Sequence, residues 1–475
     1  MVNISQVRQA IITALPKETS SYGNPINSKQ LYIPPGHENA LQLNCNLIVG
    51  ARGVGKSTWT SALAEPQSKS IIGANISELE NTQVQKGFAE TTDKELYPDI
   101  KIFNNLLQKQ FEPPDIWQAV IVRWLSKVID YKIPHKDWIS SVSWVKKNAE
   151  QVVNIIQKAS EHLRSNGRNA LIVFDALDRT SNNWQQMDDI VRELLKQVLY
   201  LKTFSNISAK VFLREDQFSR NVKNFPDASK LLANRAELTW QMNDLHGLLW
   251  QYFCNAPGDS GLVLRGIYKE VVGEEPIKQG DVWVLHDDVK REGARQRKLF
   301  EKLAGEWMGN NSRRGSTYSW VVKHLADGTG STSPRSFLLA IKEAAEESAR
   351  KDSMYPLHYE AIKQGVQKAS LNRVEEIAED YPWIRELCGK LENLNVPIEF
   401  DSIKARWIEY YPRGPGNIKT DSLPPQNADG GWIGIKEELV RIGVFDTMRD
   451  GRINMPDIYR VGFRLGRKGG VKPVD

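Results

Sequence analysis

Several features are scarce or missing in this chain of 475 residues. Its three cysteines, Cys45, Cys254 and Cys388, are scattered, and its seven histidines form no HxxxH-type cluster, so the sequence indicates no zinc site and the thiols are most simply reduced. No apolar run approaches the roughly eighteen residues of a membrane span. Residues 1–17 also lack the charged-then-apolar layout of a signal peptide. We therefore expect a cytoplasmic protein with no membrane partner.

Strong charge of one sign is also missing. The formal net charge is +5 at pH 7, which is too small to argue for nucleic-acid binding by itself. The content of 40% hydrophobic and 25% charged residues is ordinary for a globular protein, and the length permits two or three domains with proper cores. We find no internal repeat and no low-complexity tract.

A complete phosphate-binding loop is present at residues 50–57, which read Gly-Ala-Arg-Gly-Val-Gly-Lys-Ser. It follows the apolar run 47–49 and precedes a helix-compatible segment, 57–64. The glycines let backbone N–H groups turn toward a polyphosphate, Lys56 can reach the β- and γ-phosphates, and the Ser57 hydroxyl can ligate Mg²⁺. The alternative is a glycine turn that binds nothing. The motif predicts an ATP and Mg²⁺ site whose nucleotide-binding residues are Gly50, Gly53, Val54, Gly55, Lys56, Ser57 and Thr58.

Hydrolysis also needs carboxylates, and residues 171–179, Leu-Ile-Val-Phe-Asp-Ala-Leu-Asp-Arg, supply two of them after an apolar strand. We expect this strand to neighbour the strand of the phosphate loop. Asp175 is then placed to hold Mg²⁺ together with Ser57, and Asp178 to orient and deprotonate the attacking water. In the alternative interpretation Asp175 caps the next helix and Asp178 pairs with Arg179 on the surface.

Two arginines are further candidates for the catalytic site, beside Lys56. Arg214 ends the predicted strand 209–213, where a cation would face the γ-phosphate; the alternative is an ordinary arginine at a strand end. Arg335 lies in Ser-Pro-Arg at the start of an apolar helix, from which it could fold back on the phosphates. Its alternative is a solvent-exposed position.

The hydrophobic pattern predicts the organisation of the chain. Residues 1–40, with turn-rich stretches at 20–25 and 33–36, form a lead-in that wraps the first strand. Residues 41–215 alternate short apolar runs with helical ones, which is typical of a parallel sheet covered by helices. One long helix is expected from about 138 to 164. Its apolar face consists of Val142, Val145, Ala149, Val152, Ile156, Ala159 and Leu163.

The C-terminal part predicts a compact final unit. Asp450-Gly451 reads as a hairpin turn between a preceding helix and a last helix that opens at Pro456 and continues to Leu465. This order suits a winged helix. A surplus of cations there could attract DNA phosphates, or could be a protein-docking face or a solvated tail. These cations are Arg441, Arg449, Arg452, Arg460, Arg464, Arg467, Lys468 and Lys472.

Taken together, the phosphate loop, the Phe-Asp-Ala-Leu-Asp-Arg strand end, the arginine after the fourth strand and the Ser-Pro-Arg element resemble the AAA+/STAND group of P-loop ATPases. The Asp-x-Leu-Asp-Arg element is especially similar to that of the KAP and NACHT-like branches. A lid followed by a winged helix also resembles origin-recognition-type initiators. The resemblance covers about residues 35–350. It departs from AAA+ motors in that no acid directly follows Asp175, and from many KAP members in lacking membrane insertions.

The resemblance implies an ATP-driven switch that serves bacterial anti-phage defence or another conflict system with a separate effector. We predict an α/β fold of the P-loop NTPase (ASCE/AAA+-like) type, with an ATPase core at 41–215, a helical lid at 216–350 and a helical and winged-helix domain at 351–475. We also expect a homo-oligomer and Mg²⁺-dependent ATP hydrolysis. The rival functions are a DNA-binding initiator or loader in replication or transposition, and a nucleotide-binding scaffold that does not hydrolyse.

Overall fold

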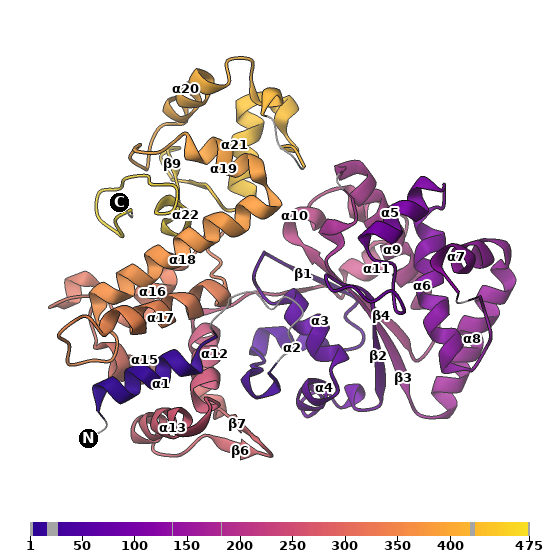
Figure 1. Cartoon of the computed structure of the whole chain (residues 1–475), viewed down its shortest axis with the longest axis horizontal. Coiled ribbons are helices and arrows are strands. Elements are labelled where there is room, and N and C mark those ends of the chain that lie inside the picture. Colours follow the sequence, from indigo (N-terminus) through magenta and orange to yellow (C-terminus); the bar gives the residue numbers. More distant parts are fainter. Residues whose placement is uncertain (1–2, 17–26, 135, 182, 419–422, 474–475) are drawn as a thin grey trace. The chain divides into compact units, whose positions relative to one another are not determined.

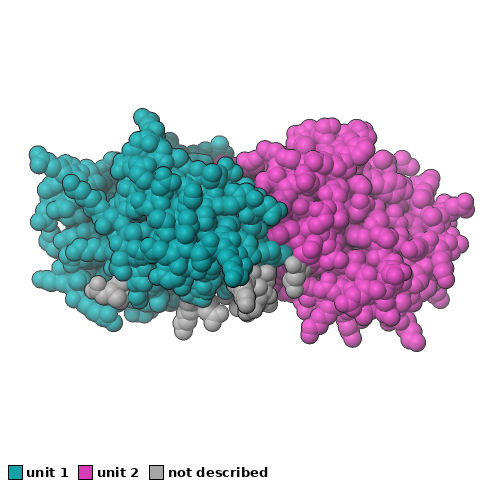
Figure 2. All heavy atoms as spheres, turned by 90° about the horizontal axis from the view of Figure 1, so that it is seen from above, with its two compact units in different colours: residues 1–20, 29–34, 240–475 teal, residues 21–28, 35–239 magenta. Residues whose placement is uncertain are grey.

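The computed structural model describes residues 3–16, 27–134, 136–181, 183–418 and 423–473. The turn-rich stretch 20–25 lies outside them. The chain divides into two compact units, coloured separately in Figure 2. We call residues 21–28 and 35–239 the sheet unit, and residues 1–20, 29–34 and 240–475 the helical unit. Among the described helices, none combines the length and the apolar character needed to cross a membrane.

The sheet unit is built on a five-stranded parallel sheet with the order β2-β3-β4-β1-β5. The strands are β1 (Leu47–Gly50), β2 (Thr82–Phe88), β3 (Asn169–Phe174), β4 (Ile207–Arg214) and β5 (Ala236–Glu237). This confirms the predicted α/β class. The prediction that the strands before the phosphate loop and before Asp175 are neighbours is wrong, because β4 lies between β1 and β3.

Helices cover both faces of this sheet, with α3 and α4 on one side and α6 and α8 on the other (Figure 1). The helices of the sheet unit are α2 (Glu38–Leu41), α3 (Lys56–Ala64), α4 (Pro66–Gly73), α5 (Ile100–Gln108), α6 (Pro113–Val128), α7 (Trp138–Lys147), α8 (Ala149–Ser165), α9 (Trp184–Leu201), α10 (Glu215–Phe218) and α11 (Ser229–Leu232). Its short 3-10 turns are η2 (Pro35–His37), η3 (Ser77–Leu79), η4 (Leu177–Arg179) and η5 (Asn221–Lys223), while η1 (Ser28–Gln30) spans the division between the two units.

The single long helix predicted from 138 to 164 is instead two helices, α7 and α8, that break at Asn148. The backbone of Asn148 is not helical (φ −128°, ψ 48°), and its side-chain amide donates to the carbonyl oxygen of Trp144 at 2.7 Å. An asparagine side chain competes in this way with the helical hydrogen-bond ladder. The break leaves Ala149, one of the predicted apolar-face residues, exposed.

The core of the sheet unit is centred on Trp117 of α6. Its ring lies 5.9 Å from that of Phe88, 5.0 Å from Phe103 and 5.6 Å from Phe174, and its indole N–H donates to the carbonyl oxygen of Ile190 at 3.0 Å. A side chain at Gly87 would place its Cβ 2.4 Å from the ring of Phe174. Glycine in β2 is therefore required for Phe174, the residue before Asp175, to pack there.

The helical unit contains most of the remaining described elements. These are α1 (Ile4–Ala14), α12 (Met242–Cys254), α13 (Gly258–Val272), β6 (Ile277–Gln279), β7 (Val282–Val284), α14 (Asp287–Arg291), α15 (Gly293–Ala304), η6 (Ser312–Arg314), α16 (Thr317–Leu325), α17 (Pro334–Ser348), α18 (Tyr359–Asp380), α19 (Pro382–Gly389), α20 (Phe400–Tyr410), η7 (Pro415–Asn417), η8 (Ala428–Gly430), α21 (Gly431–Arg441), β8 (Asp446–Thr447), β9 (Ile453–Asn454) and α22 (Asp457–Arg460). Helix α1, part of the predicted lead-in, packs against α13 and α17.

At the C-terminal end, β8 and β9 form the predicted antiparallel hairpin between α21 and α22. The last helix ends at Arg460 rather than continuing to Leu465. Arg464 adopts a left-handed backbone (φ 57°), and a Cβ on Gly462 would lie 2.7 Å from the Val374 side chain, so the chain turns tightly against α18.

Candidate functional site

The phosphate loop joins the carboxyl end of β1 to the first turn of α3. Gly53 and Gly55 have φ values of 81° and 101°, which L side chains rarely adopt. A Cβ on Gly50 would lie 2.7 Å from the Val54 side chain. The backbone angles at Gly53 and Gly55 and the close packing at Gly50 therefore each require glycine at that position. Gly55 precedes helix α3, and no side chain caps this end of the helix.

Lys56 folds over the loop that precedes it. Its ammonium group donates to the carbonyl oxygens of Gly50 and Ala51, both at 2.8 Å. Burial lowers the pKa of Lys56 to about 8, and the nearby Arg214 cation acts in the same direction, against the carboxylate of Asp175. The cation is thus held at the mouth of the loop by backbone oxygens that a phosphate group can replace.

Asp175 follows β3 directly and is only 3% exposed. Its backbone N–H donates to the carbonyl oxygen of Phe88 at 3.0 Å, and the Ser57 hydroxyl lies close enough to its carboxylate to lower the pKa of that group. Burial raises the pKa of Asp175, while the Ser57 hydroxyl and the Lys56 charge oppose that rise. The two residues predicted as metal ligands therefore lie close to one another, although a strand separates β1 from β3.

After Asp175 the chain turns through Ala176, whose backbone is left-handed (φ 56°), into η4. This turn brings Asp178 to Arg214 at the end of β4, and Arg214 Nη1 donates to Asp178 Oδ2 at 3.4 Å. The neighbouring Arg179 forms an ion pair with Glu90 at 2.5 Å. Glu90 lies just after β2, so acidic and basic side chains from the carboxyl ends of β2, β3 and β4 gather at one edge of the sheet.

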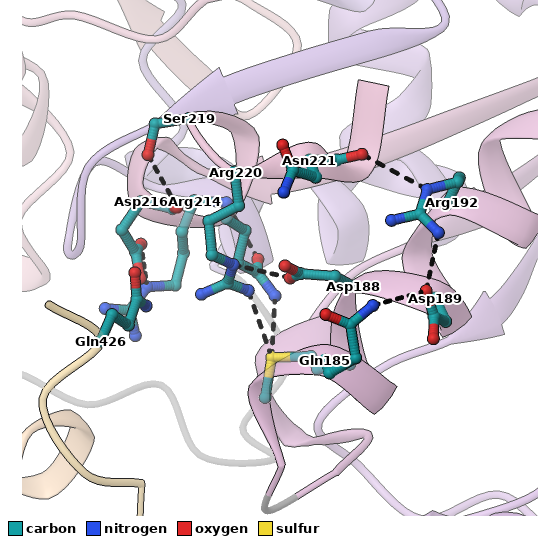
Figure 3. A network of polar contacts seen from close by, with 12 residues as sticks. Gln185, Asp188, Asp189, Arg192, Arg214, Asp216, Ser219, Arg220, Asn221 and Gln426 are labelled. Carbon is teal, nitrogen blue, oxygen red and sulfur yellow. Dashed lines mark hydrogen bonds and ion pairs between the residues drawn. The ribbon is translucent and has the colours of Figure 1, made fainter. Parts of the chain in front are cut away.

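Sequence reasoning did not assign a role to Asp216, two residues beyond the strand-ending arginine. Arg214 Nε donates to Asp216 Oδ1 at 3.0 Å, as Figure 3 shows. The Arg214 side chain is 11% exposed, against 29% for Asp178 and 13% for Asp216. The only signal in the sequence was the run Arg-Glu-Asp after a strand, which is too common to indicate a site.

A second ionic network fastens the segment after β4 to α9 (Figure 3). Arg220 Nε donates to Asp188 Oδ1 at 2.6 Å, and the Arg220 guanidinium lies 4.6 Å from the centre of the Trp184 ring. Arg192 donates from Nε to the carbonyl oxygen of Asn221 at 3.3 Å. These contacts position the chain that follows Arg214.

Arg335 belongs to the helical unit, on α17. Its Nη1 lies 3.1 Å from Glu376 Oε1 on α18, and Arg373 Nη1 binds the other oxygen of Glu376 at 3.2 Å. Arg335 is 27% exposed. Its predicted role toward the phosphates stays a prediction.

The C-terminal cations are mostly engaged inside the helical unit. Arg460 is fully buried, with its guanidinium donating to Asp457 at 2.8 Å and to the carbonyl oxygens of Leu465 and Val471. Its inclusion in a phosphate-binding surface is therefore wrong. Arg441, Arg452, Arg464 and Arg467 lie near the carboxylates of Glu438, Asp450, Glu392 and Asp457, respectively. Arg449, Lys468 and Lys472 are exposed.

The loop and strand ends fit a nucleotide and a divalent cation. The positive-φ glycines shape the backbone of the loop so that its N–H groups can face a phosphate. The Ser57 hydroxyl lies near the Asp175 carboxylate, and both are oxygen ligands of the kind that Mg²⁺ prefers. Lys56 adds a cation beside them.

A known family model matches the central part of the sheet unit. Residues 46–212 match the family model of the ATPase family associated with various cellular activities (AAA). A search of curated proteins found no similar sequence. Similar solved structures include two from Aeropyrum pernix, each at 13% identity: the ORC2 protein in its ADPNP and ADP complexes (90% of this chain, 93% of that chain, TM-score 0.33) and the ORC1 protein in complex with DNA (94% and 93%, TM-score 0.35).

TM-scores of this size are too low to show a common arrangement of the whole chains, so the identification depends on the family match and the sheet. The matched residues run from the start of β1 into β4, and include the phosphate loop and the acidic strand end. Residues 46–212 are therefore an AAA domain with the P-loop NTPase fold, and the chain that carries it is an ATPase.

Proposed function

We propose that this ATPase is an Mg²⁺-dependent switch that works in the cytoplasm as a homo-oligomer. The observation that supports this most directly is that Ser57 and Lys56, from the phosphate loop, lie close enough to Asp175 to lower the pKa of its buried carboxyl. In this proposal Lys56 binds the β- and γ-phosphates and Ser57 and Asp175 hold Mg²⁺. The remaining nucleotide contacts come from Gly50, Gly53, Val54, Gly55 and Thr58.

Asp178 acts as the general base in the proposed hydrolysis. Its carboxylate accepts a proton from the attacking water, which forms the new bond to the γ-phosphorus while the bond to the bridging oxygen of ADP breaks. When bound, Mg²⁺ would neutralise the charge that develops on the phosphate oxygens. Arg214, at the end of β4, would bind the γ-phosphate and so distinguish ATP from ADP. Arg335, on α17, would place a second positive charge near the phosphates.

We place the switch in bacterial anti-phage defence, acting with a separate protein effector. This rests on the Asp-x-Leu-Asp-Arg element at 175–179, which is similar to that of the KAP and NACHT-like branches. The test compares phage plating on the native host carrying wild type or Lys56→Ala, with the co-purifying proteins identified in both. Equal plating would contradict the defence role and leave the ATPase assignment standing.

The rival function, a DNA-binding initiator or loader, is favoured by the exposed cations Arg449, Lys468 and Lys472. Reversing Arg449 and Arg452 to Glu should weaken DNA binding most at low salt if the hairpin contacts phosphates, because fewer counterions are then released. If the same surface docks the effector, the reversal should break the co-purifying complex and leave DNA affinity alone. A gel-shift series across salt beside a pull-down separates the two.

A scaffold that does not hydrolyse is the third candidate. It predicts ATP binding without phosphate release. Phosphate release measured in the presence and absence of DNA and of the co-purifying proteins decides between this scaffold and the switch.

A further inference from the structure

The guanidinium of Arg214 is shared between two carboxylates. Its Nε binds Asp216 at 3.0 Å and its Nη1 binds Asp178 at 3.4 Å. The contact with Asp178 is the longer of the two and involves the more exposed carboxylate, at 29% against 13%. Exposed, long ion pairs are weak, so the bond to Asp178 is the one that a new anion would replace first.

The backbone around Arg214 is held in place. The Arg214 N–H donates to the Gln217 side chain at 3.2 Å, and Ser219 Oγ donates to the carbonyl oxygen of Asp216 at 2.9 Å. The ion pair between Arg220 and Asp188 at 2.6 Å fastens the same segment to α9. Exchange of partners therefore needs only movement at the end of the Arg214 side chain, not of the strand or of α10.

The guanidinium geometry allows one partner to change while the other stays. Arginine has five N–H donors in a fixed fork, and Nε and Nη1 point to different acceptors here. Asp216 can keep its bond to Nε while Nη1 turns to another anion. Lys56 lies close enough to Arg214 and Asp178 for their charges to shift its pKa, so this exchange takes place at the mouth of the phosphate loop.

We propose that Asp178 and the γ-phosphate of ATP compete for Nη1 of Arg214, and that Asp216 is the positioning residue that keeps the guanidinium at the site. This inference rests on the proposed function of the loop. While Arg214 binds Asp178, that carboxylate is less able to accept a proton from water. A γ-phosphate that takes Arg214 releases Asp178 to accept a proton from water. ADP has no γ-phosphate and leaves the pair between Arg214 and Asp178 intact.

The test is a double-mutant cycle on nucleotide affinity, measured by calorimetry with AMPPNP and ADP in the presence of Mg²⁺. Asp178→Asn removes the competitor, so AMPPNP should bind about threefold to fivefold more tightly while ADP affinity changes less. The loss of negative charge near the phosphates could also raise affinity, so the cycle includes Arg214→Gln. In the Arg214→Gln background, Asp178→Asn should no longer favour AMPPNP over ADP.

Asp216→Asn tests the positioning role. The ratio of AMPPNP to ADP affinity should fall about threefold, because the guanidinium loses the partner that holds it at the site. A purely structural role for Asp216 would lower the thermal unfolding midpoint and weaken both nucleotides equally. Arg214→Lys, which keeps the charge but not the fork, should behave like Asp216→Asn rather than like wild type.

The pair Lys196 and Glu193, 2.6 Å apart on α9, provides a matched control. Lys196→Gln and Glu193→Gln should leave the affinity ratio unchanged. Equal effects of Asp178→Asn with and without Arg214 would overturn the competition. If the wild type fails to bind AMPPNP, both the competition and the proposed nucleotide site are wrong. If the wild type binds AMPPNP normally but the effects of the two substitutions simply add, only the competition is wrong. Thermal unfolding of every variant without nucleotide verifies that each is folded.

Discussion

Replacing Lys56 with alanine tests the nucleotide site most directly. The Lys56 ammonium donates to the carbonyl oxygens of Gly50 and Ala51, and both acceptors belong to the loop that would surround a polyphosphate. Binding would exchange these two neutral acceptors for charged phosphate oxygens. The variant should therefore lose affinity for ATP while its fold persists, since alanine is a good residue for the first turn of α3.

The size of the loss can be worked out from the contacts. A hydrogen bond to a charged group contributes about 1.5–3 kcal/mol, so two bonds to phosphate oxygens amount to roughly 3–6 kcal/mol before the loss of the two carbonyl bonds is subtracted. The two bonds from the ammonium to neutral carbonyl oxygens are weaker, at about 1 kcal/mol each. The net loss is then on the order of 1–4 kcal/mol, or a factor of about 5 to 1,000 in the dissociation constant.

Isothermal calorimetry with AMPPNP and Mg²⁺ measures this loss. Lys69→Ala is a suitable control, because Lys69 also lies in the sheet unit, is partly buried and donates to a backbone carbonyl, that of Thr82, at 2.5 Å. The control should bind AMPPNP within about twofold of wild type, since it removes a lysine of the same kind that lies outside the predicted site. Wild-type affinity in folded Lys56→Ala would refute the assignment of the loop.

Three further predictions concern pH and turnover. The pKa of Lys56 is about 8, so ATP affinity should fall as pH rises above 8 and the ammonium loses its proton, whereas Lys56→Arg should bind with a flatter pH profile in calorimetry. Asp178→Asn should lower phosphate release by roughly a hundredfold or more while ATP still binds, and an unchanged rate would assign Asp178 a structural role. Burial lowers the pKa of His37 to about 4, so below about pH 6.5 the unfolded chain takes up a proton that the folded chain does not. The free energy of unfolding should therefore fall by about 3 kcal/mol as the pH drops from 6.5 to 4. Denaturant titrations should show a shallower drop for His37→Gln.

The sequence predicted the three strands that end at candidate site residues, because these strands are buried on both faces of the sheet. Residues 47–49, 170–174 and 209–213 are apolar runs of the kind that a parallel sheet requires, and each lies inside an observed strand. It missed β2, whose residues Thr82–Phe88 include two glutamines, a lysine and a glycine. That strand is at the edge of the sheet, where polar side chains are tolerated and the apolar signal disappears.

Charged residues were harder to place, because a sequence does not show which of them are internal. Lys210, within the apolar run of β4, is fully buried and donates to the carbonyl oxygens of Ala40, Gln42 and Cys45. Arg460 is buried in the same manner around backbone oxygens and Asp457. Both cations donate hydrogen bonds to backbone carbonyl oxygens within their own unit. Tertiary packing, rather than the local sequence pattern, determines which carbonyl oxygens these are.

The strand order explains why Arg214, rather than the phosphate loop alone, lies next to Asp178. If β3 had been the neighbour of β1, as expected, the acidic strand end would adjoin the loop directly and Arg214 would lie at a more distant strand tip. With β4 inserted, its last residue comes between the carboxylates that follow β3 and the loop that follows β1. Ser57 still reaches Asp175 across this gap, because α3 begins at the loop and Asp175 is the first residue after its strand. A cation at the tip of the intervening strand can then exchange partners between the two sides, and this position depends on the crossover of the chain, which no motif in the sequence encodes.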